Sequence, residues 1–458
     1  MMKLNLKFTK KQLILISLIT FFIIIGVAFT CYVINVKNPA DIKLTSAELH
    51  EFIKISNVKF PESIIKELPY PVEPAELDIF SGSAILIDAS NGCVLYEKNA
   101  DEIIPPASMT KLVVMYVVFQ EIATGRISLD DIVPLPPESW AINAPPMSSL
   151  MFLGEGQTVT LRELLLGLAV ASGNDAAIAV AHYTCGSVES FVERMNSEME
   201  ALGLVHTRFV EPSGYSELNL TTPREFAAFA KTYIERYPES LTLFHSQPSI
   251  SYPQEHNLAS WHKGTGQEKP IFQQSTNKLL NILEGCDGLK TGFIFESGYN
   301  LSLTAQRNGT RFISVTMKGP GKGSVEGNKY RISDSMTLME WAFSCFATRK
   351  KDDLQNVVVP VLCGKKLEVL LAPVNNENLT VPALLAGKSP KEAASAITVT
   401  IKLPKYVKGP INIGDVCGVV VYALEDAILL EVPLVATQKI EETNFIKKII
   451  DNLVSLFL

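Results

Sequence analysis

The longest apolar stretch of the chain lies near its start, at residues 13–34, and it contains no charged side chain. Four lysines precede it, Lys3, Lys7, Lys10 and Lys11. At about 1.5 Å per residue, the stretch is long enough to cross the roughly 30 Å hydrocarbon core of a bilayer. Because the basic residues stand before it, residues 1–36 are predicted to form an N-terminal transmembrane helix followed by an exported chain. A cleaved signal peptide and lipid attachment at Cys31 are the alternatives.

Residues 37–76 contain five prolines and are predicted to be a linker, because proline discourages regular structure. Beyond them, short apolar runs that end at turn residues predict strands. Ser83–Asp88 and Cys93–Glu97 are expected to form a hairpin around Asn91-Gly92. Two later strands are predicted at Tyr299–Ala305 and Arg311–Met317.

Apolar positions at helical spacing predict helices in the middle of the chain and one after the last strand. They cover Ser108–Thr124, Leu161–Ala171, Val188–Leu202, Pro223–Tyr237 and Asp334–Phe346. The first helix is apolar on nearly every face and should be buried. The second opens with the capping box Thr160-Leu-Arg-Glu163. Strands, then helices, then strands predict an α+β domain with a largely antiparallel sheet over residues 77–350.

The composition changes after the sequence Arg-Lys-Lys-Asp at residues 349–352. From Val357 to Val435, β-branched runs separated by Gly, Pro and Asn predict a small all-β domain over residues 352–436. The tail, residues 440–458, places apolar residues opposite lysine, aspartate and asparagine. It predicts an amphipathic helix at Phe445–Leu458, which lies either in a membrane interface or against the β-rich domain.

Composition narrows the classes of function. The formal net charge of −7 gives no basic footprint, which argues against nucleic acid as a partner. The six histidines lack the His-Glu-x-x-His spacing of zinc hydrolases, and the seven cysteines include no Cys-x-x-Cys pair. We therefore expect no metal site. The cysteines are interpreted as buried small hydrophobes, with a Cys363–Cys417 disulfide as an alternative.

The first candidate for chemistry is Ser108-Met-Thr-Lys111. One helical turn separates the two polar residues, so the Lys111 ammonium can reach the Ser108 hydroxyl from the same face. A serine hydroxyl is a weak nucleophile until a base removes its proton, and a desolvated lysine can be that base. A capping serine beside a solvated lysine is the ordinary alternative. The apolar helix around the motif favours the catalytic interpretation.

Two further motifs follow along the chain. Ser172-Gly-Asn174 comes directly after the helix that ends at Ala171, and its hydroxyl and carboxamide can both face a cleft. Lys290-Thr-Gly292 lies in an extended stretch, where the glycine lets a ligand approach the backbone closely. Taken singly, Ser172-Gly-Asn174 is also explained as a helix-end turn, and Lys290-Thr-Gly292 as a plain edge strand.

Ser-x-x-Lys, Ser-x-Asn and Lys-Thr-Gly in this order form the motif set of penicillin-binding proteins and serine β-lactamases. The sequence resembles one family among them, the low-molecular-mass D-alanyl-D-alanine carboxypeptidases, over roughly residues 78–348. The stretches that carry the resemblance are Pro106–Leu112, Ala171–Ala176, Glu211–Gly214, Asp287–Phe293 and Gly298–Leu301. The β-rich domain and the tail also match that family's layout. The resemblance implies a β-lactamase-like transpeptidase domain, with an antiparallel sheet, flanking helices and a helical subdomain.

The resemblance also implies an activity and a set of roles. The protein would be a serine carboxypeptidase that removes the terminal D-alanine from peptidoglycan stem pentapeptides through an acyl-enzyme, and β-lactams would acylate the same serine. Ser108 would be the nucleophile, Lys111 its base and Ser172 a proton relay. The substrate-binding residues would be Asn174, Lys290, Thr291, Gly292, Phe293 and Arg331. The backbone N–H groups of Ser108 and Phe293 would form the oxyanion hole. No cofactor is implied, and the site would face the periplasmic side of a bacterial cytoplasmic membrane.

Three alternatives remain at this point. A D,D-endopeptidase or transpeptidase would share the whole site. A class A β-lactamase carries Asp where this chain has Gly173, and it needs a glutamate to activate water, which Glu217-Leu-Asn219 superficially resembles. A non-catalytic muropeptide-binding protein would have no need of an intact set of catalytic residues.

Overall fold

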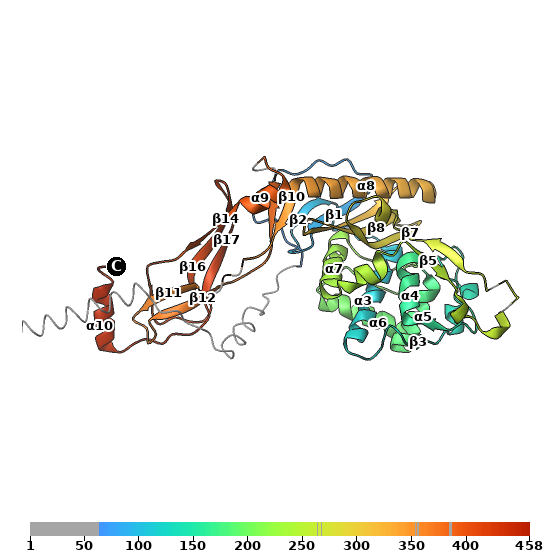
Figure 1. Cartoon of the computed structure of the whole chain (residues 1–458), viewed down its shortest axis with the longest axis horizontal. Helices are drawn as coiled ribbons and strands as arrows, with labels where there is room; N and C mark the ends of the chain where they lie inside the picture. The colour runs from blue at the N-terminus through green and yellow to red at the C-terminus, as the bar shows by residue number, and fades with distance from the viewer. Residues whose placement is uncertain (1–63, 263, 267, 353, 355–356, 384–386) are drawn as a thin grey trace, which may run out of the picture. The chain divides into compact units, whose positions relative to one another are not determined.

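The computed structural model describes residues 64–458, apart from 263, 267, 353, 355–356 and 384–386 (Figure 1). The predicted transmembrane helix, Cys31 and most of the predicted linker lie outside the described residues. Within the described part, no helix is long and apolar enough to span a bilayer. The chain forms two compact units. We call Ser63–Lys350 with Asn378–Ser395 the larger unit, and Lys351–Glu377 with Ala396–Leu458 the smaller unit.

The larger unit is built on a five-stranded antiparallel sheet in the order β2-β1-β9-β8-β7. Its strands are β1 Ser83–Asp88, β2 Val94–Lys98, β7 Cys286–Ile294, β8 Gly298–Arg307 and β9 Thr310–Gly319. The predicted sheet is confirmed, and the four predicted strands lie within two residues of their expected ends. β7 forms an edge of the sheet.

The main helices of the larger unit are α3 Thr110–Ala123, α4 Leu161–Leu166, α5 Asn174–Cys185, α6 Val188–Ala201, α7 Pro223–Arg236 and α8 Ser324–Cys345. The predicted capping box is present, and α4 continues as a π-helical turn, Gly167–Ala171. The predicted start of the last helix at Asp334 is wrong, since α8 begins at Ser324. Before Asp334, α8 buries only Gly327 and Arg331, so this part has no apolar periodicity to reveal it. α5 was not predicted.

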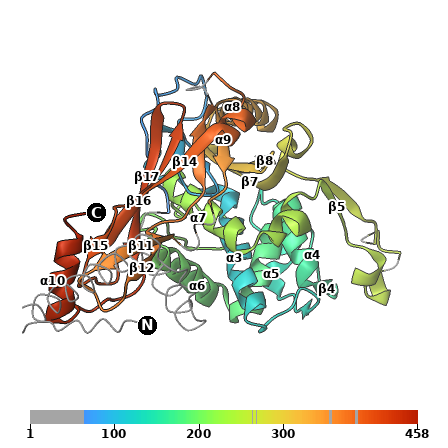
Figure 2. The same ribbon diagram turned by 60° about the vertical axis from the view of Figure 1, so that its left-hand side comes forward.

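β1 is buried at every position because helices cover both faces of the sheet. Ala84 and Leu86 lie in a hydrophobic cluster with residues of α8, whereas Ile85 and Ile87 lie in the cluster that contains α3 and α7. Figures 1 and 2 show α8 on one side of the strands and α3 and α7 on the other. Successive side chains of a strand point to opposite faces, so a strand between two helical layers is apolar throughout.

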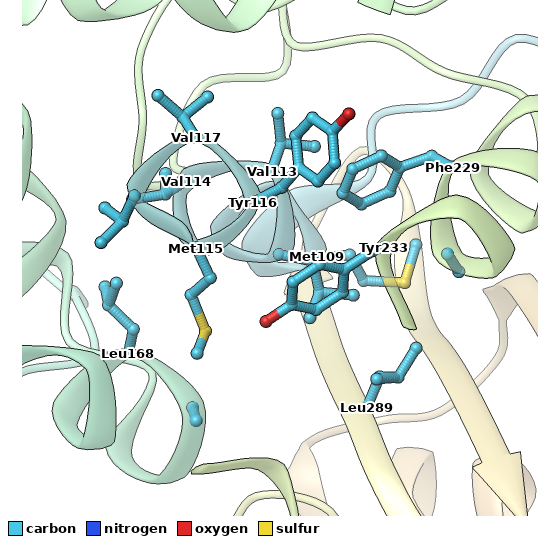
Figure 3. Close-up of a cluster of buried hydrophobic side chains, with 14 of the residues drawn as sticks. Met109, Val113, Val114, Met115, Tyr116, Val117, Leu168, Phe229, Tyr233 and Leu289 are labelled. Carbon is cyan, nitrogen blue, oxygen red and sulfur yellow. The ribbon is translucent and has the colours of Figure 1, made fainter. Parts of the chain in front are cut away.

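α3 runs through the main core of the larger unit, as its sequence predicts. Eleven of its fourteen residues are buried, which confirms a helix surrounded on all sides. Figure 3 shows its residues Val113 to Val117 beside Leu168, Phe229, Tyr233 and Leu289, from three other elements. One of the eleven buried residues is Lys111, whose ammonium group therefore lies inside an apolar core. A buried lysine without a structural counter-ion points to chemistry at the start of this helix.

The smaller unit is a six-stranded sheet in the order β14-β16-β17-β12-β11-β15, which confirms the predicted all-β domain. Its strands are β11 Val357–Leu362, β12 Glu368–Pro373, β14 Ile397–Lys402, β15 Val407–Lys408, β16 Val416–Leu424 and β17 Ala427–Ala436. All its described neighbours are antiparallel except β11 and β15.

One stretch of the predicted β-rich domain belongs instead to the larger unit. β13, Leu379–Pro382, pairs with β10, Phe346–Arg349, and the short helix α9, Pro390–Ala396, follows it. A buried polar contact holds β13 in the larger unit. The Thr380 hydroxyl donates to the Asp88 carboxylate at 2.8 Å and accepts from the Asn91 amide at 2.9 Å. Without β13, a fully buried carboxylate would lose one of its donors.

The tail forms α10, Phe445–Val454, which packs on the smaller unit through its polar side. The Asp451 carboxylate is buried and accepts the backbone N–H of Cys363, while Lys447 donates to the carbonyl of Gly364 at 2.6 Å. Phe445 and Ile446 are 75% and 72% exposed. The helix is thus docked while most of its apolar side faces outward. Cys363 and Cys417 are both free thiols, so the alternative of a disulfide between them is wrong.

Candidate active site

The first predicted motif begins just before α3, in a 3-10 turn at Ala107–Met109. Ala107 has a positive φ of 51°, a conformation that non-glycine residues rarely adopt, in the turn that leads into α3. Gly214 packs directly beneath this turn. A Cβ atom on Gly214 would lie 1.9 Å from the Ala107 carbonyl oxygen and 2.8 Å from the Ser108 nitrogen. Only glycine fits there, so Gly214 supports the serine from below.

Lys111 is fully buried and its Nζ atom has three polar partners. It donates to the Ser108 hydroxyl at 3.1 Å, to the Asn174 side-chain oxygen at 2.8 Å and to the backbone carbonyl of Ser213. The first two partners belong to different predicted motifs. The structure therefore joins the Ser-x-x-Lys and Ser-x-Asn motifs through a single amine.

Burial lowers the pKa of the Lys111 amine to about 7, against its ordinary value of 10.5. The carboxylates of Glu211 and Asp175 act in the opposite direction and raise this pKa. Burial wins because removing an ammonium group from water disfavours its charged form more than these acids favour it. Near neutral pH a large fraction of Lys111 is therefore an uncharged amine that can accept a proton.

Ser172 ends the π-helical turn after α4 in a left-handed conformation, with φ 61°, and Asn174 opens α5. Both side chains are buried. Gly173 between them has no room for a side chain, because its Cβ would lie 2.6 Å from the Asp175 carboxylate and 3.0 Å from the Met151 nitrogen. The motif is thus Ser-Gly-Asn for a steric reason.

Asp175, which the sequence did not single out, holds the loop that packs on this turn. Its carboxylate accepts the backbone N–H groups of Met151 at 2.9 Å, Phe152 at 2.8 Å, Leu153 at 3.0 Å and Ala176 at 2.9 Å. Phe152 has a positive φ of 73°, so the loop is held in a conformation that non-glycine residues rarely adopt. We assign Asp175 a positioning role. In the sequence, the one signal for this role was that Asp175 directly follows Asn174 of the Ser-x-Asn motif.

The third motif lies on β7. Lys290 is buried, and its amine donates to the carbonyl of Thr291 at 3.1 Å. Burial, followed by the positive charges of Lys111 and Arg331, lowers the pKa of Lys290 well below its ordinary range. Two basic side chains, Lys111 and Arg331, therefore lie close enough to Lys290 to disfavour its charged form. Such an arrangement fits an anionic ligand.

Gly292 brings β7 against the nucleophile turn. A Cβ atom on Gly292 would lie 2.5 Å from the Pro106 carbonyl oxygen, so only glycine allows this approach. Arg331 braces the strand from α8, and its guanidinium donates to the carbonyls of Gly292 and Asn300, each at 3.2 Å. Phe293 is 38% exposed at the end of the motif and packs on Tyr299 with ring centroids 4.3 Å apart.

The structure brings the three motifs together, as the sequence predicts. Ser108, Lys111 and Asn174 are linked by hydrogen bonds, and Gly292 packs beside the serine turn. Arg331 donates to the backbone carbonyls of Gly292 and Asn300 and to the side-chain oxygen of Asn328, so it braces β7 from α8. No group of three His, Cys, Asp or Glu side chains is placed to hold a metal ion in the part of the chain that the structure describes.

Two family models match the chain. One, described as D-alanyl-D-alanine carboxypeptidase, covers residues 70–321, and one described as penicillin-binding protein 5, C-terminal domain, covers residues 346–442. D-alanyl-D-alanine carboxypeptidase DacC of Escherichia coli (strain K12) is 32% identical over 80% of this chain and 86% of its own length. D-alanyl-D-alanine carboxypeptidase DacF of Bacillus subtilis (strain 168) is 29% identical over 81% and 89%.

The fold is also similar to solved structures. Penicillin binding protein 5 from Haemophilus influenzae superposes with a TM-score of 0.66 and 29% sequence identity, covering 81% of this chain and 100% of that one. The predicted penicillin-binding-protein-like fold, an α+β domain with a C-terminal all-β domain, is confirmed.

Proposed function

The chain belongs to the D-alanyl-D-alanine carboxypeptidase family and is a serine peptidase that removes a terminal D-alanine, and we propose that Ser108 is its nucleophile. The observation that carries the proposal is the hydrogen bond between the Lys111 amine and the Ser108 hydroxyl, at an amine whose pKa lies near 7. A neutral amine at this position is a base within reach of the proton that it must take.

In the acylation step, Lys111 accepts the Ser108 proton and Oγ attacks the carbonyl carbon between the two terminal D-alanines. The backbone N–H groups of Ser108 and Phe293 donate to the oxyanion that forms, and one such donor typically contributes about 2.7–4 kcal/mol. As the C–N bond breaks, the proton passes from Lys111 through the Ser172 hydroxyl to the leaving amine. Free D-alanine departs, and the peptide remains as an ester on Ser108.

In the deacylation step, a water molecule attacks this ester with Lys111 again as the base, and the shortened peptide leaves. Asn174 holds the amide of the stem peptide through both steps, while its oxygen keeps Lys111 in place. We assign the substrate carboxylate to the position beside the Thr291 hydroxyl and the Lys290 amine, where its negative charge would favour the protonated form of Lys290. Arg331 acts through β7, because it fixes the carbonyls of Gly292 and Asn300.

The class A β-lactamase alternative fits the geometry poorly. An aspartate at position 173 would collide with Asp175, and the Glu217 side chain is exposed. In Glu217-Leu-Asn219, the segment that resembles the β-lactamase glutamate segment, Asn219 is buried instead. Its side chain accepts the backbone N–H of Val210 and donates to the carbonyl of Glu211, which braces the loop that leads to Gly214. Endopeptidase and transpeptidase activities would share the whole site and are separated by their products.

We propose that the protein works at the outer face of a cytoplasmic membrane. α10 supports the proposal, because its polar side is bonded to the smaller unit while Phe445, Ile446 and Leu453 are exposed. An apolar helix face of this kind suits the boundary between lipid headgroups and acyl chains. The apolar run at residues 13–34 would supply a second anchor.

The test is to incubate the purified chain with a fluorescent penicillin and, separately, with a pentapeptide that ends in D-Ala-D-Ala. We expect mass spectrometry to find the penicillin on the peptide that contains Ser108, and one free D-alanine for each tetrapeptide formed. Cross-linked dimers among the products would indicate transpeptidation. A label on any other residue would overturn the assignment of Ser108.

A further inference from the structure

The segment that follows the β5–β6 hairpin runs along the exposed edge of the active-site strand β7. β5 is Ser249–Tyr252 and β6 is Ile271–Gln274, and Figure 2 shows this hairpin projecting from the helices of the larger unit. Buried neighbours fix the segment after it. The Ser275 N–H donates to the carbonyl of Pro248 at 2.7 Å, and the Asn277 amide donates to the carbonyl of Gly288 at 3.2 Å. The residue between them, Thr276, is thereby held in one place.

Thr276 connects the two walls of the active site. Its backbone N–H donates to the carbonyl of Val170 at 3.4 Å, two residues before Ser172. Its hydroxyl lies 2.8 Å from the hydroxyl of Thr291, which donates to it. Thr276 therefore stands where the wall that carries Ser172 meets the wall that carries the Lys-Thr-Gly motif. No motif points to a lone threonine, so the sequence alone did not reveal it.

The paired hydroxyls suit a carboxylate. When Thr291 donates its proton to Thr276, the Thr276 proton is left for a ligand, and a hydroxyl can rotate to meet the acceptor that arrives. The Lys290 amine beside Thr291 is a further N–H donor at this place, and an anion would favour its protonated form. The Arg331 guanidinium already donates to the backbone carbonyls of Gly292 and Asn300 and to the Asn328 side chain.

We propose that Thr276 is a specificity-determining residue, which accepts the proton of Thr291 and donates its own hydroxyl proton to the free carboxylate of the leaving D-amino acid. The proposal rests on the function proposed above, since it assumes that a peptide ending in D-Ala-D-Ala occupies this cleft. A substrate whose leaving residue ends in a carboxamide has no negative charge and turns N–H donors toward hydroxyl donors. Hydrogen bonds to charged groups are about twice as strong as those between neutral groups, so the carboxylate is preferred.

The experiment compares two substrates in the full-length protein. One is a diacylated tripeptide ending in D-Ala-D-Ala, and the other is its C-terminal amide. Both give the same acyl-dipeptide product, so one chromatographic assay yields kcat and KM for each. Thr276→Val removes the hydroxyl and keeps the shape, Thr276→Ser restores the hydroxyl, and Thr242→Val is the control at an exposed threonine outside the cleft.

We expect Thr276→Val to raise KM for the carboxylate substrate by about tenfold or more, with kcat and both constants for the amide close to the parent values. Thr276→Ser should restore most of the preference, and Thr242→Val should change nothing. An unchanged ratio of kcat/KM between the two substrates in a folded Thr276→Val protein would overturn the proposal, and so would an equal loss on both. If the parent protein releases no product from either substrate, the proposed function fails instead.

Discussion

The two units of this chain treat buried charge in opposite ways. In its active site the larger unit gathers three basic side chains, Lys111, Lys290 and Arg331, and burial lowers the pKa of each. The smaller unit buries Asp451 beside the backbone N–H of Cys363 and 3.7 Å from the Lys447 amine, so that opposite charges are matched. Like charges in one place reduce stability, and they persist where an anion is bound or a proton moved. The matched charges of Asp451 and Lys447, by contrast, serve to hold α10 on the smaller unit.

The largest expected effect follows from removing the nucleophile of the larger unit. Ser108→Ala should lower D-alanine release by at least about a thousandfold and abolish penicillin labelling, because Ser108 is the one hydroxyl that bonds to the Lys111 amine within the described residues. The measurement is product release together with fluorescence of the labelled protein on a gel. Ser344→Ala, at an exposed serine of α8, is the control and should behave like the parent. A labelled Ser108→Ala protein would refute the assignment.

Lys111→Ala should lower kcat/KM by about 10²–10⁴-fold, since the serine then lacks its base. In the parent protein, kcat/KM should rise with pH around a midpoint near 7, where the buried amine loses its proton, and then level off. Rates on a soluble peptide between pH 5 and 9 check both statements. A profile that falls through pH 7 would mean that Lys111 acts as a charged group.

Lys111 should also give stability a pH dependence. The unfolded chain keeps this proton up to about pH 10.4, whereas the folded chain releases it near pH 7. Between these values the unfolded state binds more protons, so the free energy of unfolding should rise as pH increases. Denaturant unfolding at several pH values measures the slope. The slope should be shallower in Lys111→Met.

Gly214→Ala tests the support beneath the serine. The new Cβ would meet the Ala107 carbonyl at 1.9 Å, so we expect it to lower stability by about 1–3 kcal/mol more than Gly203→Ala does. Gly203 is a matched control, because its φ of 75° is close to the 76° of Gly214 and nothing lies within 4 Å of its Cβ position. The rate of penicillin acylation should fall only in Gly214→Ala. Equal effects of the two changes would contradict the supporting role.

Asp175→Asn should lower acylation by about tenfold, since one carboxylate oxygen becomes an amide nitrogen that faces N–H donors. Asp88→Asn is the matched change in the same unit, at a buried carboxylate bonded to Ser90 and Thr380. It should lower the melting temperature similarly and leave acylation of the remaining folded protein unchanged. If both variants slow acylation alike, Asp175 has no special role in positioning the cleft.

The smallest effect on turnover is expected in the smaller unit. In a protein without residues 1–62, Ile446→Glu on α10 should weaken sedimentation with anionic lipid vesicles and leave kcat on a soluble peptide unchanged. Val416→Glu, at an apolar residue of β16 that is also exposed, controls for the added charge and should keep vesicle binding. A loss of turnover in Ile446→Glu would break the division of roles between the units.

Local patterns predicted much of the larger unit. Ser108 and Lys111 lie one helical turn apart, so their contact is a property of four residues, and the burial of α3 follows from apolar residues on all its faces. Asn91-Gly92 marks its hairpin in the same local way.

The rest depends on distant parts of the chain. Ser213 meets Lys111 across 102 positions, and Thr276 meets Thr291 only because of the path taken by the hairpin before it. The first half of α8 is helical without apolar periodicity, since it covers the sheet with few buried residues. Such features arise from tertiary packing, which overrides local preference.

The return of β13 to the larger unit restricts how these proteins can be recombined. A chimera joined at Lys350 would take β10 from one parent and its partner strand, with Thr380, from the other. The donor would then have to supply a hydroxyl that matches the recipient's Asp88. Exchange of the β-rich part without residues 378–395 therefore requires three junctions, at residues 350/351, 377/378 and 395/396. A single junction at residue 350 between distant relatives should give a protein in which β10 and β13 do not match.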